Sequence, residues 1–273
     1  MSFDAFYLPT ASGQRFCLVH EPDVQIARRG AIVYVHPFAE EMNKSRRMAA
    51  LQAKAMAAAG YVVMQIDLHG CGDSSGVFGD ASWASWVDDV CLAYAWLQER
   101  GESDVWLWGL RTGCLLACAA AARIEAPGKL LLWQPVLSGK QFLQQFLRLK
   151  MASEMLGGES KGAMDRLRER LAQGEAIEIA GYQLAPDLAS GLEKAELTLP
   201  EQVQRIEWFE LSGKPEAGLS PAASARIEKW QAAGARVRGQ AVIGPAFWQT
   251  AEIAESAALI DASVLALSGQ EPA

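Results

Sequence analysis

The sequence predicts an α/β protein in which helices cover both faces of an eight-stranded, mostly parallel sheet. Strand-like and helix-like segments alternate along most of the 273 residues, which is typical of repeated strand–helix–strand units. The strand-like segments are short, continuous apolar runs, as expected for strands buried on both faces. A composition of 51% hydrophobic and 21% charged residues fits a well-packed globular protein and argues against disorder.

The elements follow one another in a regular order. An opening hairpin is expected at residues 5–8 and 15–20, with Ser12-Gly13 at its turn. An alanine-rich amphipathic helix should end before Gly60, because glycine is favoured just after a helix end. The further expected strands are 31–36, 61–68, 105–109 and 129–136, and the expected helices between them are 45–59, 83–99 and 114–120.

The pattern changes between residues 137 and 200. Buried strand-like runs give way to charged, helical sequence interrupted by glycines such as Gly174 and Gly191. We interpret residues 137–200 as a helical lid insert over the sheet's carboxyl edge, in a core formed by residues 1–136 and 201–273. A surface excursion without a functional role is the alternative. The core is then expected to resume with strands 205–211 and 236–243 and helices 221–234 and 247–260.

Charge and composition exclude several classes of function. A net charge of −7 argues against a nucleic-acid partner, because binding to phosphates requires a clustered basic surface. No run of about 18 apolar residues is present, so we expect no membrane span. The N-terminus lacks the basic start and apolar run of a signal peptide. The five cysteines show no Cys-x-x-Cys spacing. We therefore expect a cytoplasmic protein with free thiols, no metal and no cofactor.

Residues 105–113, Val-Trp-Leu-Trp-Gly-Leu-Arg-Thr-Gly, have the pattern of a nucleophile elbow. In that motif, Gly-x-Ser-x-Gly, a strand turns sharply into a helix and presents an activated hydroxyl. Here Arg111 stands at the position of the serine. A guanidinium stays protonated and is not a nucleophile. The segment therefore predicts a hydrolase architecture with altered chemistry at its apex.

The partners of a serine nucleophile are also missing from their expected positions. The loop after strand 205–211 offers only Glu216 as an acid, which we interpret as a solvated carboxylate. The loop after the last strand, residues 244–248, has no histidine, and all three histidines of the chain precede residue 70. Because a serine without a general base is poorly nucleophilic, we predict that the standard Ser–His–acid triad is absent.

A polar set remains at the carboxyl ends of the strands, where open α/β sheets bind ligands. Arg111 lies at a helix start, which already favours an anion, and its guanidinium can grip a carboxylate or phosphate bidentately. The alternative is an internal ion pair with Glu40, Glu41 or Asp67 that seals the pocket. The predicted ligand-binding residues are Arg111, His36, Glu41, His69 and Gln134.

Several runs resemble the exosortase A system-associated hydrolase, type 2. They are residues 29–48, which include His-Pro-Phe-Ala-Glu-Glu-Met-Asn-Lys, and residues 108–113, 131–141 and 179–184. The resemblance implies an α/β-hydrolase fold and a bacterial protein associated with the PEP-CTERM sorting system, which is linked to exopolysaccharide production. It also implies that an arginine at the elbow is usual in the family. It implies no particular substrate.

Three functions remain open from the sequence. The first is binding of an acidic or acyl small molecule near Arg111. The second is an ester or thioester hydrolase, or an acyl transferase, that uses a relocated site. The third is a partner-binding scaffold in the exosortase or exopolysaccharide machinery, for which the nine tryptophans offer aromatic surface. The candidates for the relocated site are His36 as base with Glu40 or Glu41, and Ser45, Cys71 or Ser138 as nucleophile.

Overall fold

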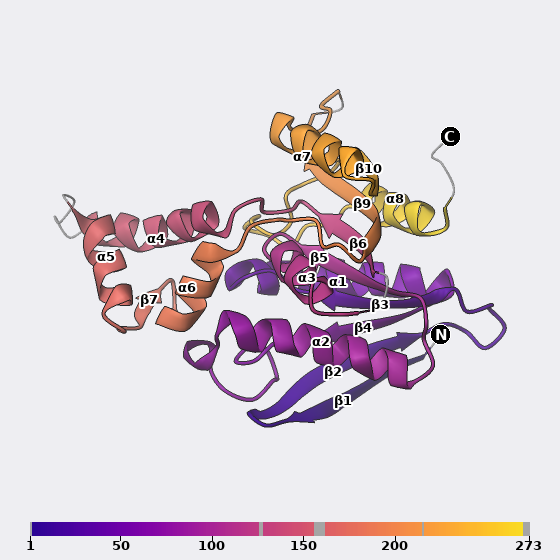
Figure 1. Ribbon diagram of the computed structural model, residues 1–273, viewed down its shortest axis with the longest axis horizontal. Helices are drawn as coiled ribbons and strands as arrows, with labels where there is room; N and C mark the ends of the chain where they lie inside the picture. The colour runs from indigo at the N-terminus through magenta and orange to yellow at the C-terminus, as the bar shows by residue number, and fades with distance from the viewer. Residues whose placement is uncertain (1, 126–127, 156–161, 215, 270–273) are drawn as a thin grey trace.

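The computed structural model describes residues 2–125, 128–155, 162–214 and 216–269 (Figure 1). Its central sheet has eight strands in the order β1-β2-β4-β3-β5-β6-β9-β10. The pairs β1–β2 and β2–β4 are antiparallel, and all the other pairs of this sheet are parallel. The predicted α/β fold, with helices around a mostly parallel sheet, is confirmed.

Most elements of the core lie where the sequence pattern predicts them. The strands of the sheet are β1 (Ser2–Thr10), β2 (Gly13–Glu21), β3 (Gly30–Val35), β4 (Tyr61–Ile66), β5 (Val105–Leu110), β6 (Gly128–Trp133), β9 (Val203–Ser212) and β10 (Arg236–Ile243). The helices of the core are α1 (Glu40–Ala58), the 3-10 turn η1 (Phe78–Asp80), α2 (Trp83–Glu99), α3 (Gly113–Ala121), α7 (Pro221–Ala232) and α8 (Ala257–Leu267).

Two apolar layers, one on each face of the sheet, account for the continuous hydrophobic runs. Ile32 of β3 packs in the layer that contains Met56 of α1. The next residue, Val33, packs in the opposite layer with Val90 of α2. Successive side chains of a strand point to opposite faces, so a strand covered on both sides must be apolar at every position.

Two helices differ from the sequence prediction. Helix α1 begins at Glu40 rather than at Ser45. The predicted final helix, residues 247–260, is wrong: α8 runs from Ala257 to Leu267. The Ser256 hydroxyl caps α8 by accepting from the Leu259 N–H at 3.3 Å. Phe247 and Trp248, at the start of the predicted helix, are buried in the core within irregular backbone rather than on the face of a helix.

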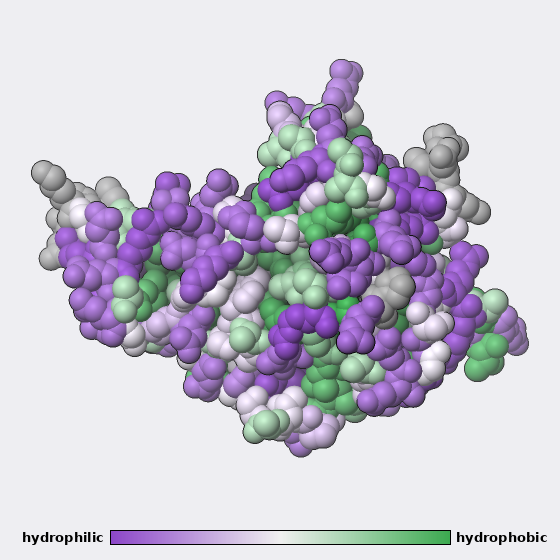
Figure 2. Space-filling model, in the orientation of Figure 1, coloured by the Kyte–Doolittle hydropathy of each residue, from purple (hydrophilic) through white to green (hydrophobic). Residues whose placement is uncertain are grey.

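The segment between β6 and β9 forms an arm at one end of the sheet (Figure 1). It contains the helices α4 (Gly139–Met155), α5 (Ala163–Ala172) and α6 (Pro186–Lys194). It also contains a short hairpin, β7 (Ile177–Ile179) and β8 (Tyr182–Leu184), which the sequence did not predict because three-residue strands show no period. Residues 156–161 of the expected insert lie outside the described residues. Figure 2 shows a predominantly hydrophilic surface over this arm.

Among the helices that the structure describes, none combines the length and the hydropathy required to cross a lipid bilayer.

Candidate functional site

The turn between β5 and α3 places Arg111 at a sharp apex. Arg111 has a φ of 56°, in the left-handed region that residues other than glycine seldom adopt. A Cβ on Gly109 would lie 2.6 Å from the Cα atom of Cys114, and one on Gly113 would lie 2.2 Å from the carbonyl oxygen of Val35. The strand and helix can approach this closely only because both positions are glycine. This is the strand–turn–helix geometry that the glycine pattern predicts.

The steric demand at Gly113 gives a stability prediction. Gly113→Ala is expected to lower the free energy of unfolding by about 1–3 kcal/mol, because the added methyl group must displace backbone atoms of β3. Gly213→Ala is the matched control, since a Cβ there meets no atom within 4 Å. Urea denaturation followed by tryptophan fluorescence measures both variants, and equal midpoints would contradict the expectation.

A cleft of about 350 Å³ opens beside this apex. It is bordered by the loop after β3, the start of α1, the elbow, helix α4 and the segment after β10. The cleft therefore lies at the carboxyl ends of the parallel strands, where α/β sheets commonly bind ligands. Its walls are largely apolar, with Phe38, Phe142, Phe146, Leu149 and Trp248 among them.

Arg111 and Glu41 form an ion pair inside this cleft. The Nε and Nη2 atoms of Arg111 both lie 3.3 Å from the same oxygen, Oε1 of Glu41. The Arg111 guanidinium also lies over the ring of Trp248, with 5.3 Å from Cζ to the ring centroid. Each side chain of the pair is 19% exposed. Of the three carboxylates considered from the sequence, Glu41 is the one that meets Arg111.

The other two carboxylates have different partners. The Tyr182 hydroxyl of β8 donates to Oε2 of Glu40 at 3.0 Å, and the Asn43 amide also donates to that oxygen at 3.2 Å. Asp67 lies 3.4 Å from Nη2 of Arg46 and accepts from the Asp73 N–H at 3.0 Å. Glu40 thus ties the arm to the start of α1, whereas Asp67 holds the loop after β4.

The Glu41 carboxyl is in an unfavourable place for a charge. Its Oε2 atom is buried and has no hydrogen-bond partner in the part of the chain that the structure describes. Burial raises the pKa of Glu41, and the positive charge of Arg111 lowers it by less. The 3.3 Å contacts are longer than the ~2.7–2.9 Å of a strong charge-assisted hydrogen bond. Glu41 is therefore protonated more easily than an exposed glutamate.

A second residue with strained backbone borders the same cleft as Arg111. Ala39, just before α1, has a φ of 50°. The main-chain N–H groups of Phe38, in the loop after β3, and of Thr112, directly after the apex, have no acceptor among the described residues. In a nucleophile elbow, donors from these two segments bind the oxyanion of an acyl group. Of the four described non-glycine residues with a positive φ, Ala39 and Arg111 border this cleft, and strained backbone is frequent at functional sites.

His36 does not reach the cleft. Its ring is buried: Nδ1 donates to the carbonyl oxygen of Pro37 at 2.8 Å, and Nε2 accepts from the Leu68 N–H at 3.3 Å. Burial lowers the pKa of His36. The imidazole is thus held neutral with both nitrogens occupied, and it pins the loops after β3 and β4 together.

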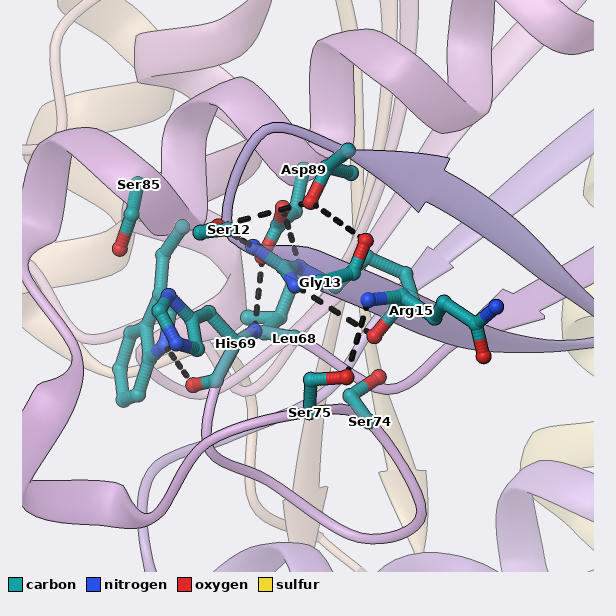
Figure 3. A network of polar contacts seen from close by, with 12 residues as sticks. Ser12, Gly13, Arg15, Leu68, His69, Ser74, Ser75, Ser85 and Asp89 are labelled. Carbon is teal, nitrogen blue, oxygen red and sulfur yellow. Dashed lines mark hydrogen bonds and ion pairs between the residues drawn. The ribbon is translucent and has the colours of Figure 1, made fainter.

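His69 and its neighbours form a separate buried network, drawn in Figure 3. The His69 N–H donates to Oδ2 of Asp89 at 2.7 Å, and the His69 carbonyl accepts from the Trp86 indole at 2.9 Å. Arg15 donates to Oδ1 of the same aspartate at 2.7 Å. The ring packs against Gly76, where a Cβ would lie 2.5 Å from Nε2. His69 therefore anchors the loop after β4 rather than lining the cleft.

Gln134 joins two strands instead of facing a ligand. Its Oε1 atom accepts from the Leu211 N–H at 2.7 Å, and its own N–H donates to the Phe209 carbonyl at 2.7 Å. Its φ of 44° turns the chain away from β6 at this point. The side chain takes the place of a ladder hydrogen bond between β6 and β9.

The predicted nucleophiles do not gather around a base. The Ser45 hydroxyl donates to the Glu41 carbonyl at 2.6 Å, and the Ser138 hydroxyl donates to Glu196 at 2.7 Å. Cys71 is buried, and burial raises the pKa of its thiol. Within the described residues none of the three is hydrogen-bonded to His36. Glu216 is exposed on its loop.

Sequence reasoning named only Arg111, Glu40 and Glu41 of the residues that line the cleft, and it missed Trp248 and Lys44 among others. Trp248 covers the Arg111 guanidinium from the segment after the last strand. The sequence pattern predicts a helix over residues 247–260, which gives no indication that Trp248 lies in the cleft. Lys44 lies one turn beyond Glu40 on α1 and also borders the cleft, with no ion pair to any described residue. The position of Lys44 in the charged run after His36 is the sequence feature that could have identified it as a cleft residue.

Comparison with protein families gives one match. The family model for serine aminopeptidase, S33 (Hydrolase_4) matches residues 26–172, which is just over half of the chain. The matched region includes β3, α1, the elbow and α4. No curated protein matches the sequence.

Solved structures with the same fold include several esterases and hydrolases. Est1E from Butyrivibrio proteoclasticus with ferulic acid bound is 15% identical, with a TM-score of 0.70, over 97% of this chain and 99% of that chain. A thermostable carboxyl esterase from Bacillus coagulans is 16% identical, with a TM-score of 0.61, over 89% and 91%. XC6422 from Xanthomonas campestris, an α/β serine hydrolase without a lid, is 14% identical, with a TM-score of 0.55, over 98% and 93%. Identities this low establish the fold alone.

Proposed function

We propose that this chain, which belongs to the serine aminopeptidase S33 family of α/β hydrolases, binds an acidic or acyl small molecule in the cleft headed by Arg111. The observation that carries the proposal is the guanidinium at the elbow apex, bordered by unpaired main-chain donors and apolar walls. Such a site suits recognition of an anionic head with an apolar body.

A degenerate triad is part of this proposal. Arg111 cannot attack a carbonyl carbon, because a guanidinium has no free lone pair at neutral pH. The segment after β10, which supplies the histidine in α/β hydrolases, presents Trp248 to Arg111 instead. The relocated site weighed as an alternative would need His36 as a base, but both of its ring nitrogens are engaged by the main chain. Binding without triad hydrolysis fits these contacts better.

The guanidinium at the apex supports an anionic ligand. Arg111 and Lys44 border the cleft together with Glu40 and Glu41, and Nη1 of Arg111 has no acceptor among the described residues. Est1E, which has the same fold, binds ferulic acid, a carboxylic acid with an aromatic body. Ferulate is therefore a suitable first probe for this chain.

The proposal is tested by calorimetric titration of ferulate into the wild-type protein and Arg111→Ala. The variant is expected to bind about 10- to 100-fold more weakly, because it loses charge-assisted hydrogen bonds. Arg123→Ala is the matched control: Arg123 is paired with Asp88 on the surface, and its loss should leave binding unchanged.

A fluorophosphonate probe completes this test. We expect no residue of the wild-type protein to be labelled selectively. Equal ferulate affinity in wild type and Arg111→Ala would refute the binding site. Selective labelling of Ser45 or Ser138, with ester hydrolysis that disappears on its replacement, would favour the relocated enzyme instead.

We further propose that the protein acts in the bacterial cytoplasm in association with the exosortase A and PEP-CTERM system, with a protein partner from the exopolysaccharide machinery. The support is the resemblance of residues 29–48, 108–113, 131–141 and 179–184 to the type 2 hydrolase of that system. Cell fractionation and co-purification from the native host test both statements.

A further inference from the structure

The ion pair at the apex leaves hydrogen-bonding groups unused on both sides. Arg111 directs two of its three guanidinium nitrogens at a single oxygen of Glu41. Among the described residues, the Nη1 group of Arg111 has no acceptor and the Oε2 atom of Glu41 has no donor. An unpaired buried carboxyl oxygen costs free energy, so the pair is complete only when a third group joins it.

We infer that the cleft binds a compact monocarboxylic acid, whose carboxylate lies between the Arg111 guanidinium and a protonated Glu41 that donates to it. The inference rests on the proposed function and names the class of ligand at the same site. Glu41 then acts as a specificity-determining residue: its proton is donated to an acceptor oxygen of the ligand, and the ligand's charge is balanced by Arg111.

The charges that face Glu41 explain why one proton must accompany the ligand. Helix α1 contributes Glu40 and Lys44, and the elbow contributes Arg111. Helix α4, the loop after β3 and the segment after β10 contribute only uncharged residues to the described lining of the cleft. The two cations and two carboxylates that border the empty cleft are thus equal in number, with Glu41 paired to Arg111 and Glu40 held by Tyr182. A ligand carboxylate adds one negative charge, and protonation of Glu41 restores the balance.

Two carboxyl groups held this close share a proton for a general reason. Like charges a few ångströms apart in a poorly solvated site disfavour double ionisation, so one group takes up a proton and donates it to the other. Burial already raises the pKa of Glu41 in the empty cleft. A ligand carboxylate beside it raises that pKa further.

The walls of the cleft limit the size and the polarity of the part of the ligand beyond its carboxylate. Phe38, Phe142, Phe146 and Trp248 present apolar surface next to the charged apex. The volume of about 350 Å³ is near the lower end of the ~300–1,000 Å³ usual for small-molecule sites. A phosphate dianion would bring a second negative charge towards Glu41 without another cation to balance it. A monocarboxylate with one ring or a short acyl chain fits best.

The test is calorimetric titration with 3-phenylpropanoate, phenyl phosphate and the uncharged 3-phenylpropanol between pH 5.5 and 8.5. Each titration is run in two buffers of different ionisation enthalpy, which gives the number of protons taken up. We expect 3-phenylpropanoate to bind most tightly, with proton uptake approaching one per ligand at high pH. Its affinity should then fall by about tenfold for each pH unit.

Glu41→Gln is the decisive variant, because an amide mimics the protonated acid. We expect it to bind 3-phenylpropanoate with no proton uptake and no loss of affinity at high pH. Arg111-dependent binding without proton uptake in wild type, or tighter binding of phenyl phosphate, would overturn this inference and leave the proposed function standing. If neither anion binds more tightly than 3-phenylpropanol, or if Arg111→Ala binds as wild type does, both fail. Circular dichroism confirms that each variant is folded.

Discussion

Asp89→Ala is expected to destabilise the protein by about 3–5 kcal/mol, because it leaves the buried Arg15 guanidinium without its counter-charge. The two side chains are 4% and 2% exposed, respectively. The other carboxyl oxygen of Asp89 accepts from the His69 main chain, so the same change also leaves an N–H group unpaired. Figure 3 shows how this aspartate of α2 holds β2 and the loop after β4 together.

The neighbouring residue provides the control for this prediction. Asp88 is paired with Arg123 at 2.6 Å, but these side chains are 59% and 54% exposed. Ion pairs in water contribute little, so Asp88→Ala should change stability by no more than about 0.5 kcal/mol. Urea denaturation curves of the two variants give the comparison. Similar unfolding free energies for Asp88→Ala and Asp89→Ala would show that the buried network is not a main support of the fold.

Phe38→Ala is expected to cost about 3–5 kcal/mol and to weaken ligand binding as well. Phe38 is 2% exposed. Its ring meets Phe78, Trp86, Phe142 and Phe146 at centroid distances of 5.3, 5.6, 5.6 and 5.1 Å. Because the last two belong to α4, the ring joins the core to the arm and forms one wall of the cleft.

Phe3→Ala serves as the control for the loss of a phenyl ring. Phe3 of β1 is 68% exposed, so its replacement should alter stability by no more than about 0.5 kcal/mol and leave binding unaltered. Thermal unfolding and ferulate titration are measured on both variants. A Phe38→Ala protein with wild-type stability and affinity would mean that the aromatic cluster neither fastens the arm nor shapes the cleft.

The geometry of the elbow depends on its two glycines. Gly109 and Gly113 permit the close approach of β5, α3 and β3, and Arg111 adopts a positive φ at the apex. These features depend on backbone sterics, which do not involve the side chain at the apex. A serine or an arginine can therefore occupy the same turn and produce different chemistry there.

The core of the fold could be predicted because its signals are local. Residues 31–35 of the expected strand 31–36 form a continuous hydrophobic run, since the strand is covered on both faces, and the structure has β3 at Gly30–Val35. The expected helix 83–99 became α2 (Trp83–Glu99), where Ser82 caps the first turn by accepting from Ser85. Both signals lie within a few neighbouring residues and need no knowledge of the tertiary structure.

Elements whose signals are weak or ambiguous could not be placed in this way. The sequence around Phe247 and Trp248 predicts a helix. Their side chains are only 0% and 5% exposed, but the backbone there is irregular. The hairpin of Ile177–Ile179 and Tyr182–Leu184 has strands too short to show alternation. Apolar side chains report burial, and burial alone does not distinguish a strand, a helix and a packed loop.

The sequence by itself determined that an arginine occupies the apex of the elbow and that no histidine follows the last strand, because both are statements about positions along the chain. Only the tertiary structure decided that Glu41 meets this arginine. Adjacent residues of a helix point about 100° apart, so the start of α1 turns Glu41 into the cleft and Glu40 towards Tyr182. Which carboxylate faces the guanidinium depends on where that helix begins and how it packs. Neither can be deduced from a sequence with two consecutive glutamates.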